Sequence, residues 1–269
     1  MKLIQVDSNH HQVSAFNRAF QFGDGHFTTL LIENYTVHLW HLHKQRLIHA
    51  NQVLLFPDLD FTQIEASLNQ IAQTGLSKIV KILISRGNSA RGYAVPDAIE
   101  AEVYLYISDY LPQQFQYPDG VELGIVKTVI GQQPSLAGLK HCNRLEQVLI
   151  KQELLANKLT DGLVLDQGSN IIETSLANVF FYLGDSWITP DLSLSGVSGV
   201  MRTFALEQLQ ALGLSVKVAH ISINELDSIQ AGFITNALIK ATPINNINGK
   251  KLNLEFAKTI TRKLNEAVG

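Results

Sequence analysis

The chain has 269 residues, of which 46% are hydrophobic and 17% charged, and its formal net charge is -3. This length allows two domains, and the composition is typical of a globular protein. The small negative charge argues against nucleic acid and anionic membranes as partners. No apolar run reaches the roughly 20 residues of a membrane span, and the N-terminus turns polar after Val6, unlike a signal peptide. The single cysteine, Cys142, excludes an internal disulfide and fits a reducing compartment, so we expect a cytoplasmic protein.

The first part of the chain predicts a small α/β domain over residues 1–110. Apolar and β-branched segments predict strands at 3–6, 26–32, 35–39, 78–85 and 102–108, and helical patterns cover 41–55 and 61–73. The histidines at 38, 41, 43 and 49 have no helical i, i+4 pair and no interleaved acidic or cysteine ligand, so we expect no metal site. The glycine-rich loop from Arg86 to Tyr93 carries two arginines, and is either a flexible surface turn or a clamp for a carboxylate.

Residues 111–120 contain two prolines and little periodicity, and predict a linker to a larger α/β domain over 121–269. Strands are expected at 121–130, 162–166, 170–173, 177–182, 186–188, 214–219 and 232–236. Helices are expected from 145, after 199, as a short capped turn from 222, and over 254–267, with a hairpin turn at Asn248-Gly249.

Lys140 is the most unusual residue of this second domain. The helix that follows has Leu145, Val148, Leu149 and Leu155 along one side, so Lys140 is expected just before a helix N-terminus. The positive end of the helix dipole disfavours a cation there, and a neutral lysine amine can form an imine with a carbonyl. An isolated lysine is more often a solvated surface residue, and partner residues elsewhere in the chain must decide between these interpretations.

The loop Ser195–Gly199 precedes a helix whose apolar residues are Met201, Phe204, Ala205, Leu209 and Leu212. Free backbone N–H groups and the helix dipole make such an N-terminus a potential phosphate site. Many helices begin after glycine, so this pattern is weak by itself.

Five segments, taken together, resemble the fold-type IV pyridoxal-phosphate enzymes, a family that includes branched-chain and D-amino-acid aminotransferases and 4-amino-4-deoxychorismate lyases. They occur in the family's order between about Arg18 and Pro243, and they are Phe22–Thr29, Arg46-Leu47, Lys140, Glu173 with Asn178 five residues on, and Gly199–Arg202. The resemblance implies the two-domain α/β architecture of that family, pyridoxal 5'-phosphate as cofactor and a homodimer.

The resemblance also implies a role for each cofactor residue. Lys140, in the larger domain, would hold the cofactor covalently and then act as general base. Glu173 would lie against the pyridine nitrogen. Arg46 would bind the phosphate together with the backbone N–H groups of Val200 and Met201. Asn236 and Ala237 occupy the position of a second phosphate-binding loop, in which Ala237 replaces the usual Thr or Ser.

Within the family, the chain most resembles the 4-amino-4-deoxychorismate lyases. This rests on Thr28-Thr29, on the loop from Ser85 to Tyr93 and on the segment Gly138–Gln147. The resemblance implies conversion of 4-amino-4-deoxychorismate to 4-aminobenzoate and pyruvate by proton abstraction, β-elimination and aromatisation. Thr29 would assist Lys140 in proton transfer, and the substrate carboxylates would pair with Arg91, Arg86 or Arg144.

Two alternatives remain open. The first is a D-amino-acid or branched-chain aminotransferase on the same scaffold, although aminotransferases commonly carry a tyrosine where this chain has Arg144. The second is a catalytically silent binding module, which would have no use for Lys140, Glu173 and Arg46 together. The fold alone does not separate these functions.

Overall fold

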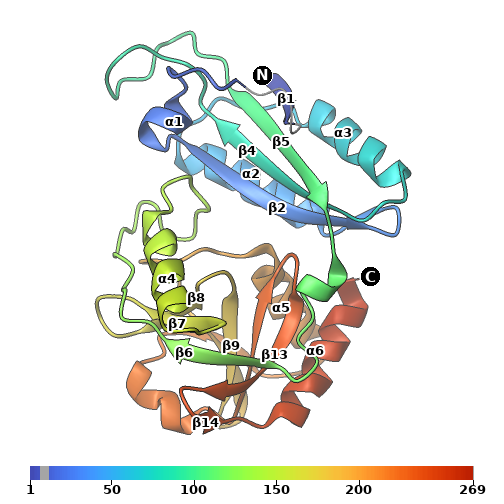
Figure 1. Ribbon diagram of the computed structural model, residues 1–269, viewed down its shortest axis with the longest axis vertical. Coiled ribbons are helices and arrows are strands. Elements are labelled where there is room, and N and C mark those ends of the chain that lie inside the picture. The colour runs from blue at the N-terminus through green and yellow to red at the C-terminus, as the bar shows by residue number, and fades with distance from the viewer. Residues whose placement is uncertain (7–11, 269) are drawn as a thin grey trace. The chain divides into compact units, whose positions relative to one another are not determined.

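The computed structural model describes residues 1–6 and 12–268, which form two compact units. The first unit comprises Met1–Pro112 with Lys140–Asn143, and the second comprises Gln113–Leu139 with Arg144–Gly269. Each unit is built on a sheet of its own, accompanied by helices (Figure 1). The predicted mixed α/β class is confirmed, and Lys140 groups with the first unit although it follows the linker in the sequence.

The first unit contains a five-stranded sheet in the order β1-β5-β4-β2-β3. β1 is parallel to β5, and the other neighbouring strands are antiparallel. Three helices accompany the sheet. The elements are β1 (Lys2–Val6), α1 (Arg18–Phe22), β2 (Gly25–Glu33), β3 (Thr36–Val37), α2 (Trp40–Val53), α3 (Thr62–Gln73), β4 (Lys78–Ser85) and β5 (Glu102–Asp109).

The helices α2 and α3 cover one face of this sheet. Leu47 of α2 and Ile64 and Leu68 of α3 pack in a core with Leu30 of β2 and Ile82 of β4. Because side chains alternate along a strand, the odd-numbered residues of β2 point to the opposite face. The strand therefore presents one row of side chains to the helices and a second row away from them.

The second unit contains a nine-stranded sheet in the order β11-β10-β9-β12-β13-β6-β7-β8, with β14 paired to β13. A short 3₁₀ turn, η1 (Pro112–Gln114), lies where the chain passes from the first unit to the second. The other elements are β6 (Val121–Ile125), α4 (Leu145–Ala156), β7 (Asp161–Leu165), β8 (Ile171–Thr174), β9 (Asn178–Leu183), β10 (Ser186–Pro190), α5 (Val200–Ala211), β11 (Val216–Ala219), η2 (Ile223–Ser228), β12 (Ala231–Asn236), β13 (Lys240–Ile247), β14 (Lys250–Lys251) and α6 (Leu254–Val268).

Aromatic side chains form the core beneath α5 and α6. The rings of Phe180 in β9 and Phe233 in β12 stack with centroids 4.7 Å apart. Ala205 of α5 and Leu264 of α6 pack in the same cluster and are fully buried. This packing holds α5 against the sheet, and the start of this helix is part of the predicted cofactor site.

The strand predicted over 121–130 is much shorter than expected. β6 ends at Ile125, whereas the apolar pattern predicts a strand to Ile130, which forms only an isolated bridge. The carboxylate of Glu153 accepts hydrogen bonds from the backbone N–H groups of Lys127 and Thr128, at 2.6 and 2.9 Å. A side chain of α4 thus replaces the strand partner that would have continued the sheet.

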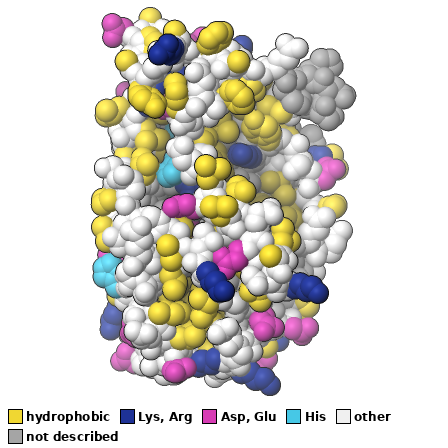
Figure 2. All heavy atoms as spheres, turned by 60° about the vertical axis from the view of Figure 1, so that its left-hand side comes forward, with side chains coloured by type: hydrophobic (Ala, Val, Ile, Leu, Met, Phe, Trp, Pro, Cys, Tyr) yellow, Lys and Arg dark blue, Asp and Glu magenta, His cyan; other side chains and the backbone are white. Residues whose placement is uncertain are grey.

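The apolar side predicted for α4 is not buried against the residues that the structure describes. Leu145, Val148, Leu149 and Leu155 are all exposed, and the helix packs through Ile150 and Leu154 instead. Figure 2 turns the side of Figure 1 on which α4 lies toward the viewer and shows apolar side chains at the surface. The sequence pattern identified the helix correctly, but the apolar side that it shows is not the side that packs in the core.

The elements α1, η1, β13 and β14 were not predicted, although the hairpin turn between β13 and β14 was. The capped turn predicted from Ser222 has the full capping box. Among residues 1–6 and 12–268, no helix is both long enough and apolar enough to cross a bilayer.

Candidate active site

Lys140 lies in a segment that continues the sheet of the first unit. The N–H of Phe27 donates to the carbonyl of Lys140 at 2.9 Å, and the N–H of Cys142 donates to the carbonyl of Gly25 at 2.8 Å. A Cβ at Gly25 would lie 2.7 Å from the Ile84 carbonyl oxygen and 3.2 Å from Sγ of Cys142, so glycine permits this close approach. The segment is therefore fixed by backbone hydrogen bonds to β2.

This placement corrects the helix-dipole argument for Lys140. The helix α4 begins at Leu145, with Arg144 as its N-cap residue. The field of a helix terminus falls off within about the first turn, and Lys140 precedes the first helical residue by five positions. The position of Lys140 beside β2, rather than the helix terminus, defines its surroundings.

The amine of Lys140 lies against an aromatic ring. Its Nζ is 4.9 Å from the ring centroid of Phe27. Nζ of Lys81 is 4.6 Å from the same centroid and 5.4 Å from that of Tyr106. Sequence reasoning did not single out Lys81, although the alternation of β4, with a lysine between apolar residues, was visible. The structure thus adds a second cation beside the ring that Lys140 contacts.

Thr28 and Thr29 point to opposite faces of the sheet. Thr29 pairs with Lys81 in the β2–β4 register and shares its face with Phe27, the ring beside Lys140. Thr28 is fully buried on the face that α2 and α3 cover. Only the second threonine is thus on the face of the strand that carries the Phe27 ring.

Arg46 approaches β2 from α2, on the helix-covered face. Its Nη2 donates to Oγ1 of Thr28, and this oxygen lies 2.6 Å from Nδ1 of His43. Burial, together with the positive charges of Arg46 and His41, holds the pKa of His43 well below its usual value. Arg46 is therefore positioned by a buried hydroxyl, beside an imidazole that is neutral.

A second buried histidine ties β2 to α2. Nε2 of His26 lies 2.7 Å from Oδ1 of Asn51. Burial lowers the pKa of His26 to about 4, with smaller contributions from Arg46 and Arg86, although the bond to Asn51 acts in the opposite direction. His26 is thus neutral near pH 7.

Arg86, predicted as a candidate substrate ligand, makes its hydrogen bonds within the first unit. Its Nε contacts both carboxylate oxygens of Asp24, at 3.0 and 2.8 Å, and its other nitrogens donate to the carbonyls of Leu54 and Leu55. Burial raises the pKa of Asp24, but the hydrogen bonds and charges of Arg86 and Arg18 outweigh burial and lower it overall. Arg86 is thus buried in an internal ion pair.

Arg91 is exposed, and nearby residues of its loop are held by hydrogen bonds from Arg18. The guanidinium of Arg18 donates to the carbonyls of Tyr93 and Ala94 at 2.9 and 3.2 Å, and the ring of Tyr93 lies 5.4 Å from that of Phe22. In the second unit, Nη2 of Arg144 donates to the carbonyl of Leu139 at 2.8 Å. Among the three predicted substrate arginines, Arg91 is the exposed one.

Glu173 lies in the second unit and is buried. Its Oε2 accepts a hydrogen bond from the N–H of Val197 at 3.0 Å. Asn178 holds the same loop at two points, since its Nδ2 donates to the Val197 carbonyl at 2.8 Å and its Oδ1 accepts from Gly199 at 3.1 Å. The pair Glu173 and Asn178, noted in the sequence for its spacing, thus fixes the loop that leads into α5.

The same loop is bonded to the segment that leads to Lys140. The N–H of Gly138 donates to the Gly196 carbonyl at 3.0 Å, and the Gly138 carbonyl accepts from Ser198 at 2.9 Å. Gly138 precedes Lys140 by two residues.

The helix α5 begins at Val200, with Gly199 as its N-cap. A Cβ at Gly199 would lie 2.2 Å from Oδ1 of Asn178, so only glycine fits here. Val200 and Met201 are the first two helical residues, and their N–H groups have no acceptor within the helix. Their side chains are buried, so the predicted contact with an anion would come from their backbones.

Asn236 shapes the turn after β12. Its Oδ1 accepts hydrogen bonds from the N–H groups of Leu238 and Ile239 at 2.8 and 3.0 Å, and its Nδ2 donates to the Leu176 carbonyl at 3.1 Å. Ala237 lies inside this turn and has no side-chain donor to offer. The asparagine side chain thus sets the backbone of the predicted second phosphate loop.

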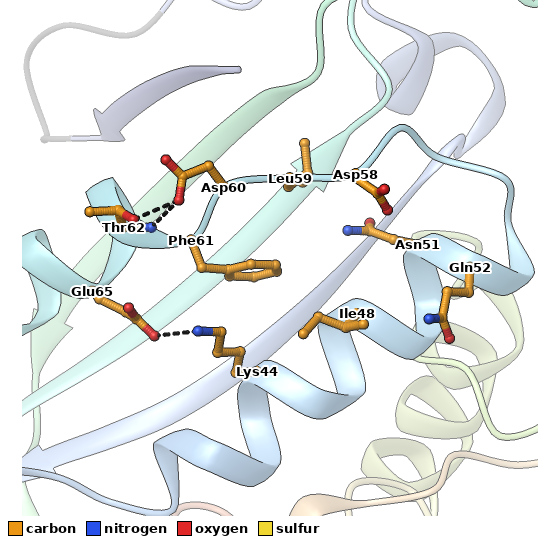
Figure 3. A pocket seen from close by; sticks show the side chains of 10 residues that line it. All are labelled: Lys44, Ile48, Asn51, Gln52, Asp58, Leu59, Asp60, Phe61, Thr62 and Glu65. Atoms are coloured by element: carbon orange, nitrogen blue, oxygen red, sulfur yellow. Dashed lines mark hydrogen bonds and ion pairs between the residues drawn. The ribbon is translucent and has the colours of Figure 1, made fainter.

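A pocket of about 360 Å³ lies elsewhere in the first unit, between the end of α2 and the start of α3 (Figure 3). Its lining includes Lys44, Asn51, Phe61 and Glu65, and Nζ of Lys44 is 2.8 Å from Oε1 of Glu65. None of the predicted site residues lines it. This pocket is therefore separate from the residues predicted to bind the cofactor.

Comparison with known proteins identifies the family. The family model described as amino-transferase class IV matches residues 25–247, which is most of the chain. The chain belongs to the class IV aminotransferase family. Enzymes of this family depend on pyridoxal phosphate, and the predicted fold-type IV architecture is confirmed. The predicted site residues are of the types that this cofactor requires, namely an amine, a buried carboxylate, an arginine and a helix N-terminus.

The family members most similar to this chain include lyases. The aminodeoxychorismate lyase of Vibrio harveyi is 35% identical over 254 residues, with 92% of each chain covered. The structure of the 4-amino-4-deoxychorismate lyase of Pseudomonas aeruginosa has a TM-score of 0.86 at 31% identity, covering 96% of this chain and 95% of that one. A branched-chain aminotransferase from Escherichia coli has a TM-score of 0.85 at 17% identity, covering 96% and 90%, and shows the shared fold.

Proposed function

We propose that this chain is a pyridoxal-phosphate-dependent lyase that converts 4-amino-4-deoxychorismate to 4-aminobenzoate and pyruvate, a step of folate precursor synthesis. The observation that carries the proposal is the 35% identity to the Vibrio harveyi lyase over almost the full length of both chains. Retention of Lys140, Glu173 and Arg46 in the positions of the family's motif supports a working enzyme rather than a silent binding module.

The cofactor residues are distributed over the two units. Lys140 would hold the cofactor covalently, and Glu173, anchored through Val197, would face the pyridine nitrogen. Arg46 and the N–H groups of Val200 and Met201 would bind the phosphate, with the turn at Asn236 and Ala237 as a further donor region. When bound, pyridoxal phosphate supplies an electron sink that makes removal of a carbon-bound proton feasible.

The chain's own residues move the proton. Lys140 would take it from the ring carbon that carries the substrate's amino group. The bond from the neighbouring carbon to the enolpyruvyl oxygen then breaks, so that the ring becomes aromatic and enolpyruvate leaves. Enolpyruvate takes up one proton at its methylene carbon and becomes pyruvate, which balances the proton removed from the ring. Thr29 supports this step from the face of β2 that carries Phe27, the ring that the Lys140 amine contacts.

The substrate carries two carboxylates, which require cations. The exposed Arg91 and Lys81, whose amine lies against Phe27 and Tyr106, are the cations that we propose for them. Arg86 is left out of this set because Asp24 and two carbonyls already accept its hydrogen bonds. Arg144 stays in the set as a less direct candidate, since one of its nitrogens donates to Leu139.

The test is incubation of the purified holoenzyme with 4-amino-4-deoxychorismate, with 4-aminobenzoate followed by fluorescence and pyruvate by a coupled assay. Equal amounts of the two products are expected, without any added keto acid. The competing aminotransferase function predicts transfer of an amino group to the cofactor instead of release of these two products. Conversion of the cofactor to pyridoxamine phosphate by an amino acid, with no 4-aminobenzoate formed, would refute the lyase.

We also propose that the protein is a cytoplasmic homodimer. The exposed apolar side chains of α4, namely Leu145, Val148, Leu149 and Leu155, support this proposal. A helix face of this kind is costly to leave in water and is typical of an interface. A second copy of this chain is the occupant that we propose for the α4 face.

A further inference from the structure

A buried chain of three side chains connects α2 to β2, and the proposed chemistry does not use two of its members. Arg46 donates from Nη2 to Oγ1 of Thr28, which lies 2.6 Å from Nδ1 of His43. Thr28 and His43 are 0% and 1% exposed. A buried polar group destabilises the folded protein unless it has a hydrogen-bond partner. We therefore expect each of these polar groups to be hydrogen-bonded, which allows the donor and the acceptor of each bond to be assigned.

The donors and acceptors of this chain are fixed by their chemistry. A guanidinium has only N–H donors, so the hydroxyl oxygen of Thr28 must accept from Arg46. The Thr28 hydroxyl proton then points to His43, and Nδ1 of His43 must accept it. This requires a neutral imidazole with its proton on Nε2, and the depressed pKa of His43, caused first by burial, agrees.

The geometry ties the orientation of Arg46 to rigid elements. Thr28 lies in the middle of a strand paired with β4, and His43 and Arg46 are three residues apart on one side of α2. An arginine side chain loses considerable rotamer entropy when it is fixed, and a pre-oriented one loses less on binding an anion. The Thr28 hydroxyl can donate only one proton, and His43 accepts it. The hydroxyl oxygen is therefore oriented to accept from the Arg46 guanidinium.

We infer that Thr28 and His43 are positioning residues for the cofactor phosphate, acting through Arg46. The inference rests on the proposed function in one respect, namely that Arg46 binds that phosphate. It assigns a role to the first threonine of the Thr28-Thr29 pair that differs from the role of the second. Thr29 serves the proton-transfer face, and Thr28 serves the phosphate through the helix-covered face.

The test compares two titrants that differ only in the phosphate, pyridoxal 5'-phosphate and pyridoxal, added to full-length protein freed of cofactor. Thr28→Val removes the hydroxyl at nearly constant volume. We expect it to raise the Kd for pyridoxal phosphate about tenfold, the effect of one hydrogen bond to a charged group, and the Kd for pyridoxal by less than about twofold. Thr28→Ser keeps the hydroxyl and should retain the parent Kd for both.

Substitution of His43 tests the other end of the chain. His43→Phe removes the acceptor and should reproduce the selective loss seen for Thr28→Val. His43→Asn places an amide oxygen near the position of Nδ1 and should recover most of the affinity for pyridoxal phosphate. Urea unfolding shows which variants fold. A folded variant at either Thr28 or His43 is enough for the comparison of the two titrants.

Arg46→Gln separates the positioning role of Thr28 and His43 from the phosphate-binding role of Arg46. If it weakens pyridoxal phosphate but not pyridoxal, while Thr28→Val and His43→Phe do not discriminate, the positioning role is overturned and the phosphate role of Arg46 stands. If Arg46→Gln itself does not discriminate, both are overturned. Equal losses for the two titrants in Thr28→Val would indicate a general packing role and also overturn the inference.

Discussion

At the scale of the residue, the two lysines beside Phe27 have different proposed roles, Lys140 for the cofactor and Lys81 for the substrate. Lys140 and Lys81 lie 4.9 and 4.6 Å from the same ring centroid, and the sequence motif predicts only Lys140 as the cofactor lysine. A lysine at a protein site serves either as a nucleophile and base or as a point charge. The two roles predict different losses on substitution.

Lys140→Ala should lose the visible absorbance of the bound cofactor and at least roughly 1000-fold of the activity, because both the covalent attachment and the general base are removed. Lys81→Gln is the matched control. It should keep the absorbance and raise KM for the substrate, since it removes a charge only. Absorbance spectra and steady-state kinetics of the two variants check this, and full activity of Lys140→Ala would contradict the assignment.

His26 makes the stability of the first unit dependent on pH. Its pKa is about 4 in the folded protein, against about 6.5 for an unperturbed histidine, so the unfolded chain binds the proton more tightly. The contribution is present above pH 6.5 and is lost as the pH falls toward 4, by up to about 3 kcal/mol. Urea unfolding at several pH values should show a shallower decline for His26→Gln, which keeps a donor toward Asn51. An unchanged slope would rule out His26 as its source.

At the scale of the element, the position of the start of α5 depends on the loop that precedes it. Side chains from two strands hold this loop in place. Glu173 of β8 bonds the N–H of Val197, and Asn178 of β9 bonds both Val197 and Gly199. The helix supplies the N–H groups, but these side chains decide where they point. A change at Gly199 should therefore affect anion binding more than stability.

Gly199→Ala places a Cβ where Oδ1 of Asn178 now lies, at 2.2 Å, so the loop must move. We expect roughly a tenfold or larger rise in the Kd for pyridoxal phosphate, measured by titration of cofactor-free protein. Gly213→Ala, just after the other end of α5, is the control. Nothing lies within 4 Å of its Cβ, and its φ of +72° costs about 1 kcal/mol of stability without touching the loop. Equal Kd values in both variants would contradict this role of the loop.

At the scale of the whole molecule, the packing of a single chain does not explain why the apolar face of α4 is exposed. Leu145 and Leu149 are 79% and 58% exposed and one helical turn apart. Such pairs are stabilised when a partner surface covers them, and their burial contributes to association at about 25 cal/mol per Å².

The double variant Leu145→Ser, Leu149→Ser should shift the protein from dimer toward monomer. Light scattering should give twice the 29.8 kDa chain mass for the parent and a concentration-dependent lower mass for the variant, with a dimer Kd raised roughly 100-fold. Leu212→Ser, at an isolated exposed leucine after α5, should leave the dimer intact. A variant that remains dimeric at low concentration would place the interface elsewhere.

The sequence by itself determined most of the elements and the family. Strand and helix periods placed β4 and α3 to within a residue, and motif order identified Lys140, Glu173 and Arg46 as candidates. The elements and the family were predictable because they depend on local periodicity and on residue types that the chemistry requires. The roles of those residues remain proposals, to be tested by the substitutions above.

Only the tertiary structure decided which face and which partner each side chain has. It placed Thr28 and Thr29 on opposite faces of β2 and paired Arg86 with Asp24. It also placed the amine of Lys81 beside the ring of Phe27 and left the apolar side of α4 exposed. It also replaced the helix terminus at Lys140 by a pairing with β2. These outcomes depend on contacts between residues far apart in the chain, and a period or a motif carries no information about which distant segment will pack against it.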